Sequence, residues 1–401
     1  MIWITGIGTA TPLGNTYPEV ADSLMQGRSA VRAVDSFDTT QQVSRIAGQC
    51  DKLPTPDGFD PVDFARIYSA DQAALWCAVQ ALRDAGWWTT RRDVRVGIVL
   101  GLGAEWNYVW EADAHRGGDM VCTADSPDGG IADRLQTKLA VRGPCGTVAA
   151  ACASGNIALG QARRWLEMGW VDVCIAGGIE MSVRPLCFAA FGNLGALSPH
   201  NDAPQTVSRP FDRGRNGFVL GEGGVLFVME REETARRRGA KPHAELAGFG
   251  ASSDASHLVI PSEDPLPAAR AIRAALKDAQ VDPSDVNYIN AHATSTPVGD
   301  RFETKAIHEA FGPHSRSIPV SSTKSMTGHM LSAAAAFEAL ACIAAIERGA
   351  VPPTINLDDP DPECDLCHVP HQAREHRVDV AVNNSFGFGG SNTCVVLRRA
   401  A

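Results

Sequence analysis

Apolar positions along the chain fall into continuous runs and helically spaced runs, which predict strands alternating with helices. The continuous runs, typical of strands, are Val94–Leu100, Val171–Ala176, Gly224–Glu230, Val286–Ile289, Val378–Val382 and Thr393–Leu397. The helically spaced runs are Ala70–Ala85, Asn156–Met168, Pro267–Ala279 and Leu331–Arg348. This alternation, with no low-complexity linker and no short repeat, predicts a layered α/β protein.

Composition and charge narrow the class of protein. With 401 residues, of which 44% are hydrophobic, the chain can bury a large core and hold two or three domain-sized units. We see no secretory leader and no apolar stretch of about 20 residues, so we expect a cytoplasmic protein without a membrane span. The 11 cysteines lack the spacing of a disulfide scaffold, which predicts reduced thiols. A net charge of −10 argues against nucleic acid as a partner.

The segment Ala151–Gly155 carries one cysteine where a turn leads into the predicted helix at Asn156–Met168. Backbone N–H groups at a helix start lack an intrahelical partner, and the helix dipole is positive there. We therefore expect a lowered pKa for Cys152 and a thiolate that acts as a nucleophile. The small neighbours would let a substrate carbonyl approach, and backbone amides would hold its developing oxyanion. The alternative is a buried structural cysteine.

Two histidines lie at the ends of predicted elements, where site residues are commonly displayed. His292 follows the strand-like run Val286–Ile289, and His329 precedes the alanine-rich helix Leu331–Arg348. A single histidine in such a place is more often a surface or capping group. Two of them, together with a cysteine at a helix start, indicate a catalytic site.

Motifs in a fixed order connect these residues to a known family. The chain resembles the β-ketoacyl-acyl carrier protein synthases, the elongating condensing enzymes of fatty acid and polyketide assembly, and in particular synthase II of the thiolase superfamily. The matching segments are Thr5–Gly8, Pro12–Gly14, Ala151–Gly155, Arg209–Asp212, Gly217–Val219, Gly221–Gly223, Asn290–Thr296, Lys324–His329 and Asn384–Asn392.

The resemblance implies a five-layered αβαβα thiolase-type fold built from two similar halves. We place an N-terminal half that carries the cysteine at residues 1–243 and a C-terminal half that carries the histidines at residues 244–401. The duplication itself is not visible in the sequence. The resemblance also implies a homodimer that receives its substrates on the phosphopantetheine of an acyl carrier protein, with no cofactor and no metal.

Residue roles follow from the same resemblance. Cys152 takes an acyl group as a thioester, a malonyl thioester then loses carbon dioxide, and the resulting carbanion attacks the acyl-cysteine. His292 and His329 stabilise the charge that builds on the malonyl thioester oxygen. Lys324, paired with Glu338, maintains the charge and orientation of the site.

Further residues complete the implied site. The N–H groups of Cys152 and Phe388 form an oxyanion hole, and Phe388 is a hinged gate between Gly387, Gly389 and Gly390. The remaining implied contacts are Thr294 and Thr296 with the pantetheine arm, and Ala104 and Phe191 with the acyl chain. For the glycine-rich loop alone, a turn that holds a core aromatic is the alternative.

Some features depart from the family pattern. Glu105 and Trp106 replace small residues before the acyl pocket, which suggests an unusual acyl chain or a remodelled dimer contact. Basic residues near the docking entrance are few, because Ala65–Tyr68 keeps only Arg66 and Asn193–Gly195 has none. An acidic carrier protein would need a local basic patch to dock on a chain with this net charge.

Two alternative functions and one further motif also fit parts of this sequence. A non-catalytic chain-length partner would typically lack the cysteine, and a cysteine thioester hydrolase would release free acid without decarboxylation. The segment Cys364–His368 has the Cys-x-x-Cys-His form of haem attachment, and His371 lies nearby. Haem attachment needs an exported protein, so we interpret this segment as a turn before a strand.

Overall fold

Strands from both halves of the chain form one hydrogen-bonded sheet in the computed structural model, which describes residues 1–103, 106–115, 117–118 and 129–401. The first half contributes β1 (Ile2–Ala10), β4 (Val96–Gly101), β5 (Cys145–Val148), β6 (Val173–Glu180) and β8 (Gly223–Arg231). The second half contributes β9 (Ala244–Ser253), β10 (Tyr288–Asn290), β11 (Pro319–Ser321), β13 (Cys367–His368), β15 (Val380–Gly387) and β16 (Ser391–Arg398).

The order of the strands repeats between the halves. The first half runs β1-β8-β6-β4-β5, and the second runs β9-β16-β15-β10-β11, with β13 at its edge. In each half the first two of these pairings are antiparallel and the next two are parallel. The halves meet where β9 pairs with β1. This repetition confirms the predicted fold of two similar halves, whereas the division at residues 243 and 244 stays a prediction.

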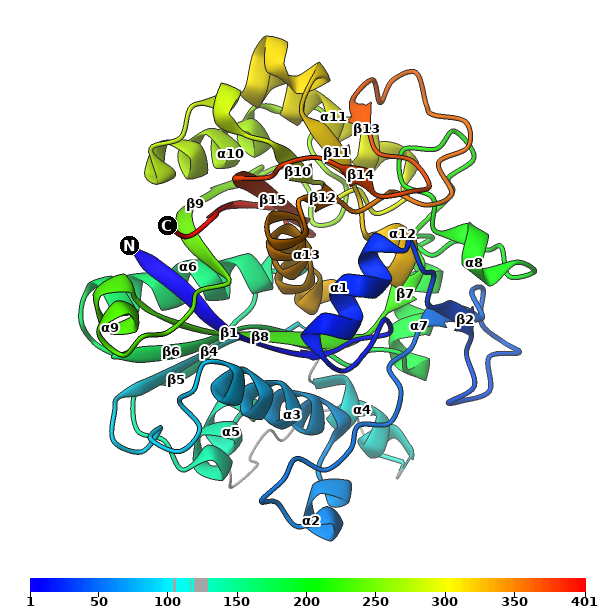
Figure 1. Cartoon of the computed structure of the whole chain (residues 1–401). Coiled ribbons are helices and arrows are strands. Elements are labelled where there is room, and N and C mark those ends of the chain that lie inside the picture. The colour runs from blue at the N-terminus through cyan, green and yellow to red at the C-terminus, as the bar shows by residue number, and fades with distance from the viewer. Residues whose placement is uncertain (104–105, 116, 119–128) are drawn as a thin grey trace.

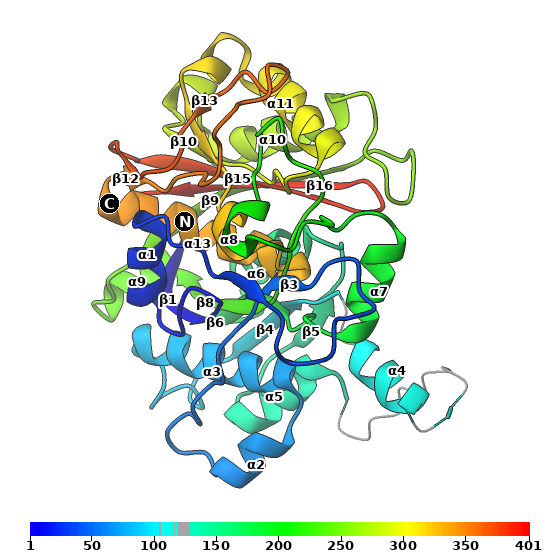
Figure 2. The ribbon, with the colours of Figure 1, turned by 90° about the vertical axis from the view of Figure 1, so that its right-hand side faces the viewer.

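Helices form three layers that alternate with the two parts of the sheet (Figure 1, Figure 2). Helices α3 (Ser69–Asp84) and α5 (Ile131–Leu139) cover the outer face of the first part. Helices α10 (Leu266–Ala279) and α11 (Pro297–Phe311) cover the outer face of the second. Between the two parts lie α6 (Ser154–Glu167) and α13 (Ala334–Arg348). The five layers and all the strands and helices predicted from apolar spacing are therefore confirmed.

The remaining elements are short or peripheral. They are α1 (Tyr17–Met25), α2 (Pro61–Arg66), α4 (Trp106–His115), α7 (Pro185–Asn193), α8 (Pro204–Val207), α9 (Glu232–Arg237), α12 (Lys324–Thr327), β2 (Val31–Ala33), β3 (Ile46–Gly48), β7 (Leu220–Gly221), β12 (Ala350–Val351) and β14 (Arg374–Glu375). No helix in the described part of the chain has both the length and the apolar character needed to cross a membrane.

The two middle helices pack closely because small residues face each other. A Cβ atom added to Gly155 would lie 2.6 Å from the backbone nitrogen of Ala336, so α6 tolerates only glycine at this position. In α13, every side chain from Ala334 to Ile346 is buried. A helix enclosed on all sides has no polar stripe, which is why this segment reads as a continuous alanine-rich run. The close packing sets the start of α6, and with it Cys152, against the second half of the molecule.

A half-buried histidine joins three layers just before β9. His243 Nε2 lies 2.8 Å from Asp84 Oδ2 at the end of α3, and its Nδ1 lies 2.7 Å from Glu347 Oε1 near the end of α13. Burial disfavours the imidazolium, but the hydrogen bonds and charges of Asp84 and Glu347 outweigh burial and raise the pKa of His243 to about 9. The charged form of His243 therefore stabilises the folded state.

We expect His243→Ala to lower the free energy of unfolding by about 1–2 kcal/mol near pH 6, after allowance for solvent screening of the carboxylates. The folded-state pKa lies above the ordinary histidine value, so the stabilisation is fully present below about pH 6.5 and lost as pH rises through 9. Urea denaturation of wild type and variant at pH 6 and pH 10 measures the difference. The exposed His314→Ala is the control, and a difference that persists at pH 10 would contradict the charge argument.

Candidate active site

Cys152 lies in the turn between β5 and α6, and its neighbours fix the shape of that turn. Ala151 has a φ of 48°, in the left-handed region that alanine rarely adopts. The Ser154 hydroxyl donates to the Ala151 carbonyl at 2.7 Å and accepts from the Ala150 amide at 2.9 Å. From β15, the Ser385 hydroxyl donates to the Cys152 carbonyl at 2.9 Å. The thiol therefore lies just before a helix, as the sequence predicts. Hydrogen bonds to Ser154 and Ser385 hold the backbone of this turn.

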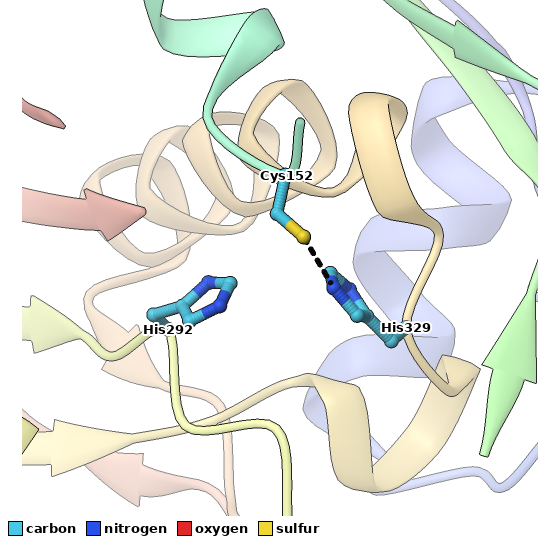
Figure 3. A group of neighbouring side chains, drawn as sticks. All are labelled: Cys152, His292 and His329. Atoms are coloured by element: carbon cyan, nitrogen blue, oxygen red, sulfur yellow. Dashed lines mark hydrogen bonds between the residues drawn. The ribbon is translucent and has the colours of Figure 1, made fainter. Parts of the chain in front are cut away.

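His329 faces the Cys152 thiol directly (Figure 3). Its Nε2 lies 2.9 Å from the Cys152 sulfur. The His329 amide donates to the Val219 carbonyl at 2.7 Å, and the Gly221 amide donates to the His329 carbonyl at 2.9 Å. Both functional residues are buried. The histidine predicted at the start of the alanine-rich helix therefore belongs to the same site as the cysteine.

His292 completes the group from the loop after β10 (Figure 3). The sulfur of Cys152 and one ring nitrogen from each histidine lie within 4.8 Å of one another. Lys324 Nζ lies 3.4 Å from His292 Nδ1 and forms an ion pair with Glu338 on α13. A charged ammonium can only donate, so Nδ1 of His292 accepts and its proton sits on Nε2. The predicted pairing of Lys324 with Glu338 is present, and it sets the tautomer of His292.

Both histidines are neutral in this environment. Burial, followed by the positive charge of Lys324, holds the pKa of His329 well below the ordinary value. The same two causes, with a smaller contribution from His329, lower the pKa of His292. Neutral imidazoles can donate or accept a hydrogen bond without bringing a charge into the site.

The expected lowering of the Cys152 pKa is wrong for the resting site. Burial raises the pKa of this thiol to about 12, although Lys324 and the backbone N–H groups of Phe388 and Cys152 act in the opposite direction. Glu338 adds to the increase. Position at a helix start does favour a thiolate, but removal of water from around the sulfur is the larger effect here. The thiol therefore needs a nearby proton acceptor when it reacts, and His329 is at hydrogen-bond distance.

Glu303 on α11 is a residue of the site that sequence reasoning missed. Its carboxylate accepts hydrogen bonds from the backbone amides of His292 at 2.9 Å and Ala293 at 2.7 Å, and from the Asn384 side chain at 3.2 Å. Burial raises its pKa to about 7, and these donors partly offset that increase. Glu303 thus fixes the loop that carries His292. A single glutamate inside a helical segment gives no signal of such a role.

The glycine-rich loop after β15 packs against the nucleophile turn. A Cβ atom on Gly387 would lie 2.5 Å from the Ala150 carbonyl oxygen, so only glycine permits this approach. Gly389 and Gly390 have φ values of 83° and 76°, in the region that favours glycine. Phe388, between them, is 36% exposed, and its amide points at the Cys152 sulfur. The oxyanion hole that the resemblance implies for the amides of Cys152 and Phe388 stays a prediction, and this position of the Phe388 amide is compatible with it.

A pocket of about 440 Å³ leads to this site. Thr294, Thr296 and Phe191 line it, as the family resemblance implies, and the two threonine hydroxyls lie 3.1 Å apart. The ring centroids of Phe388 and Phe191 are 6.4 Å apart, so Phe388 lies beside a wall of the pocket. Ala104 and Glu105 lie outside the described residues, and for Trp106 only the backbone is described.

Two groups of residues resemble metal or haem sites. Cys152, His292 and His329 are the one group in the described residues with potential metal ligands this close together, and the expectation that they bind no metal stays a prediction. The segment with the haem-attachment pattern follows a turn at residues 362–363 and ends in β13, which consists of Cys367 and His368, and His368 Nε2 lies 2.6 Å from the Cys364 carbonyl oxygen.

Two models of known protein families match most of this chain. A family model described as Beta-ketoacyl synthase, N-terminal domain, matches residues 1–235, and one described as Beta-ketoacyl synthase, C-terminal domain, matches residues 243–358. The chain belongs to the beta-ketoacyl synthase family. This ketosynthase is therefore a condensing enzyme of the acyltransferase class, as the motifs predict.

Relatives of this ketosynthase come from fatty acid and polyketide assembly. It is 40% identical to a 3-oxoacyl-(acyl-carrier-protein) synthase 2 from Synechocystis, over 99% of this chain and 97% of the relative. It is also 40% identical to a putative polyketide beta-ketoacyl synthase 1 from Streptomyces halstedii, over 98% and 97% of the two chains.

Solved structures agree with the fold. A beta-ketoacyl synthase from Burkholderia phymatum is similar with a TM-score of 0.90 at 33% identity, covering 100% of this chain and 99% of the other. A ketosynthase complex with a type II PKS acyl-carrier protein is similar with a TM-score of 0.88 at 32% identity, with the same coverage.

Proposed function

We propose that this ketosynthase joins an acyl group on Cys152 to a malonyl unit on an acyl carrier protein, with loss of carbon dioxide. The observation that carries this proposal is the convergence of one thiol and two neutral histidines at the end of a single pocket. The thiol holds the acyl group, and the histidines stabilise the negative charge that develops on the malonyl thioester oxygen. The product is a β-ketoacyl carrier protein of fatty acid or polyketide biosynthesis.

The first half-reaction transfers the acyl group. The Cys152 sulfur forms a bond to the thioester carbon, and the bond from that carbon to the pantetheine sulfur breaks. The thiol proton passes through Nε2 of His329, 2.9 Å away, to the departing pantetheine sulfur. The N–H groups of Cys152 and Phe388 hold the negative oxygen of the tetrahedral intermediate.

The second half-reaction breaks the bond between the malonyl carboxylate carbon and its neighbour, which releases carbon dioxide and leaves an enolate. His292 donates to the enolate oxygen from Nε2, whose proton is fixed by Lys324. His329 Nδ1 has no partner within the described part of the chain, so His329 is free to adopt the Nε2–H tautomer and donate as well. The enolate carbon attacks the acyl carbon, the bond between that carbon and the Cys152 sulfur breaks, and the thiolate takes up a proton from water.

Two further parts of the proposal concern assembly and location. We propose a homodimer in the cytoplasm, and light scattering tests the assembly by a mass of twice 42.6 kDa. Pairing with a related second chain of the chain-length-factor type is the alternative outcome. The presence of Cys152, His292 and His329 together favours a catalytic chain over a non-catalytic partner.

Intact-mass analysis tests the reaction. The enzyme is incubated with malonyl carrier protein and a series of acyl thioesters, and we expect the carrier mass to change to that of a β-ketoacyl product. Release of free acid from Cys152 without decarboxylation would instead favour the thioester hydrolase. The masses also identify which acyl chain is accepted.

A further inference from the structure

Exposed apolar side chains surround the opening of the catalytic pocket. We call Leu194, Leu258, Ile260, Val298 and Phe388 the apolar rim, and their exposed fractions are 47%, 82%, 57%, 58% and 36%. All of them except Leu258 line the pocket that ends at buried Cys152. The Leu258 carbonyl accepts a hydrogen bond from Gly389 at 2.8 Å, which places this segment beside the gate loop. An apolar patch of this kind, open to solvent around a pocket, is typical of an interaction surface.

The segments that form this opening carry no positive charge. Residues 190–204, 251–265, 292–299 and 386–392 contain neither lysine nor arginine. They contain four acidic residues, which are Asp202, Asp254, Glu263 and Asp264. Arg301, one turn after Val298 on α11, is already paired with Asp361 and Glu363. With four acidic residues and no lysine or arginine of their own, these four segments would repel rather than attract a partner with a dense acidic surface.

We propose that the carrier protein docks on the apolar rim through apolar side chains, and that its docking face lacks a dense acidic cluster. This inference rests on the proposed function, because the pocket that ends at Cys152 opens within the rim, and the pantetheine arm would reach the thiol through this opening. The carrier residue that bears the arm must therefore lie against the rim. Association through apolar contact is insensitive to salt, whereas association through opposite charges weakens as salt rises.

Three hexanoyl thioesters with matched chemistry test the docking mode. The first is carried by an acyl carrier protein with an acidic recognition helix, the second by the same carrier with those carboxylates changed to amides, and the third by free pantetheine. The measured quantity is kcat/KM for acylation of Cys152, from intact mass, between about 50 and about 400 mM NaCl. We expect kcat/KM for the acidic carrier to rise with salt as repulsion is screened, and the amide carrier to be preferred at low salt.

Rim variants supply the second arm of the test. Leu258→Ser should reduce kcat/KM for the amide carrier about 5- to 10-fold more than for free hexanoyl-pantetheine. Val298→Ser should act in the same direction. Met168→Ser is the control, because Met168 is 51% exposed and follows the last residue of α6, at the opposite end of that helix from Cys152. This control should leave kcat/KM for all three thioesters unchanged.

Each contrary result has a distinct meaning. A kcat/KM that falls with salt for the acidic carrier, or rim variants that treat carrier and free pantetheine alike, would overturn apolar docking while leaving the condensation intact. A change of oligomeric mass in the rim variants would identify the rim as an interface between copies of this chain. Failure of all three thioesters to acylate the wild type would overturn the proposed function itself.

Discussion

Cys152→Ala should abolish formation of the acyl-enzyme while leaving the fold intact. The sulfur is the atom that bonds to the acyl carbon, and no other thiol lies near His292 and His329 within the described residues. Alanine fills nearly the same space in a turn whose shape depends on Ser154 and Ser385, so the loss reflects chemistry rather than unfolding. Intact mass after incubation with hexanoyl-pantetheine measures the adduct, and circular dichroism checks the fold.

Two other cysteines provide matched controls for this prediction. Cys145 on β5 contacts Asp133 and Gln136, and Cys394 is buried in β16 and does not belong to the group formed by Cys152, His292 and His329. Cys145→Ala and Cys394→Ala should both still be acylated. An adduct of the same mass that persists in Cys152→Ala would show that another residue is the nucleophile, and the assignment of Cys152 would be wrong.

Most of the fold follows from local sequence patterns. The elements that these patterns do not predict include some in which other residues interrupt the apolar pattern. β1 was not predicted because Thr and Gly residues interrupt its apolar run, yet all nine of its residues are buried. α11 was not predicted because acidic Asp300 and Glu303 fall on its buried face. Their carboxylates accept backbone N–H groups of the loops around Thr296 and His292. A pattern of apolar spacing cannot reveal a helix whose buried side chains serve neighbouring loops.

The main residues of the site could be predicted from motifs, whereas the pKa of the thiol could not. Cys152, His292 and His329 are far apart in the chain. The order of the family motifs, rather than apolar periodicity, indicated that they share one site. The pKa of Cys152 was misjudged because the position at a helix start is visible in the sequence, whereas the burial of the sulfur is a property of the assembled layers. Glu303 was missed for the same reason. Tertiary burial decides both the charge state of the thiol and the orientation of the histidine loop.

His329→Ala should separate the two half-reactions. In the first, the acyl oxygen is held by backbone N–H groups that the substitution leaves in place, and water in the vacated space can relay the thiol proton to the departing pantetheine sulfur, although more slowly than the imidazole does. In the second, the enolate oxygen loses one of its two donors. Removal of one such donor typically reduces the rate by about 10²–10³-fold, and paired donors need not act additively. We therefore expect acylation of Cys152 to continue while decarboxylation of malonyl carrier protein falls by about that factor.

A conservative substitution distinguishes lost hydrogen bonding from disturbed packing. The His329 ring packs edge-on against Phe218 at a centroid distance of 5.3 Å, so alanine also removes a contact. His329→Gln keeps an N–H donor of similar reach and should recover part of the decarboxylation rate. Carbon dioxide release from malonyl carrier protein, measured beside acylation of the same preparation, gives both rates. Decarboxylation at the wild-type rate in His329→Ala would show that His292 alone stabilises the enolate, because His292 keeps its hydrogen bond from Lys324 in that variant.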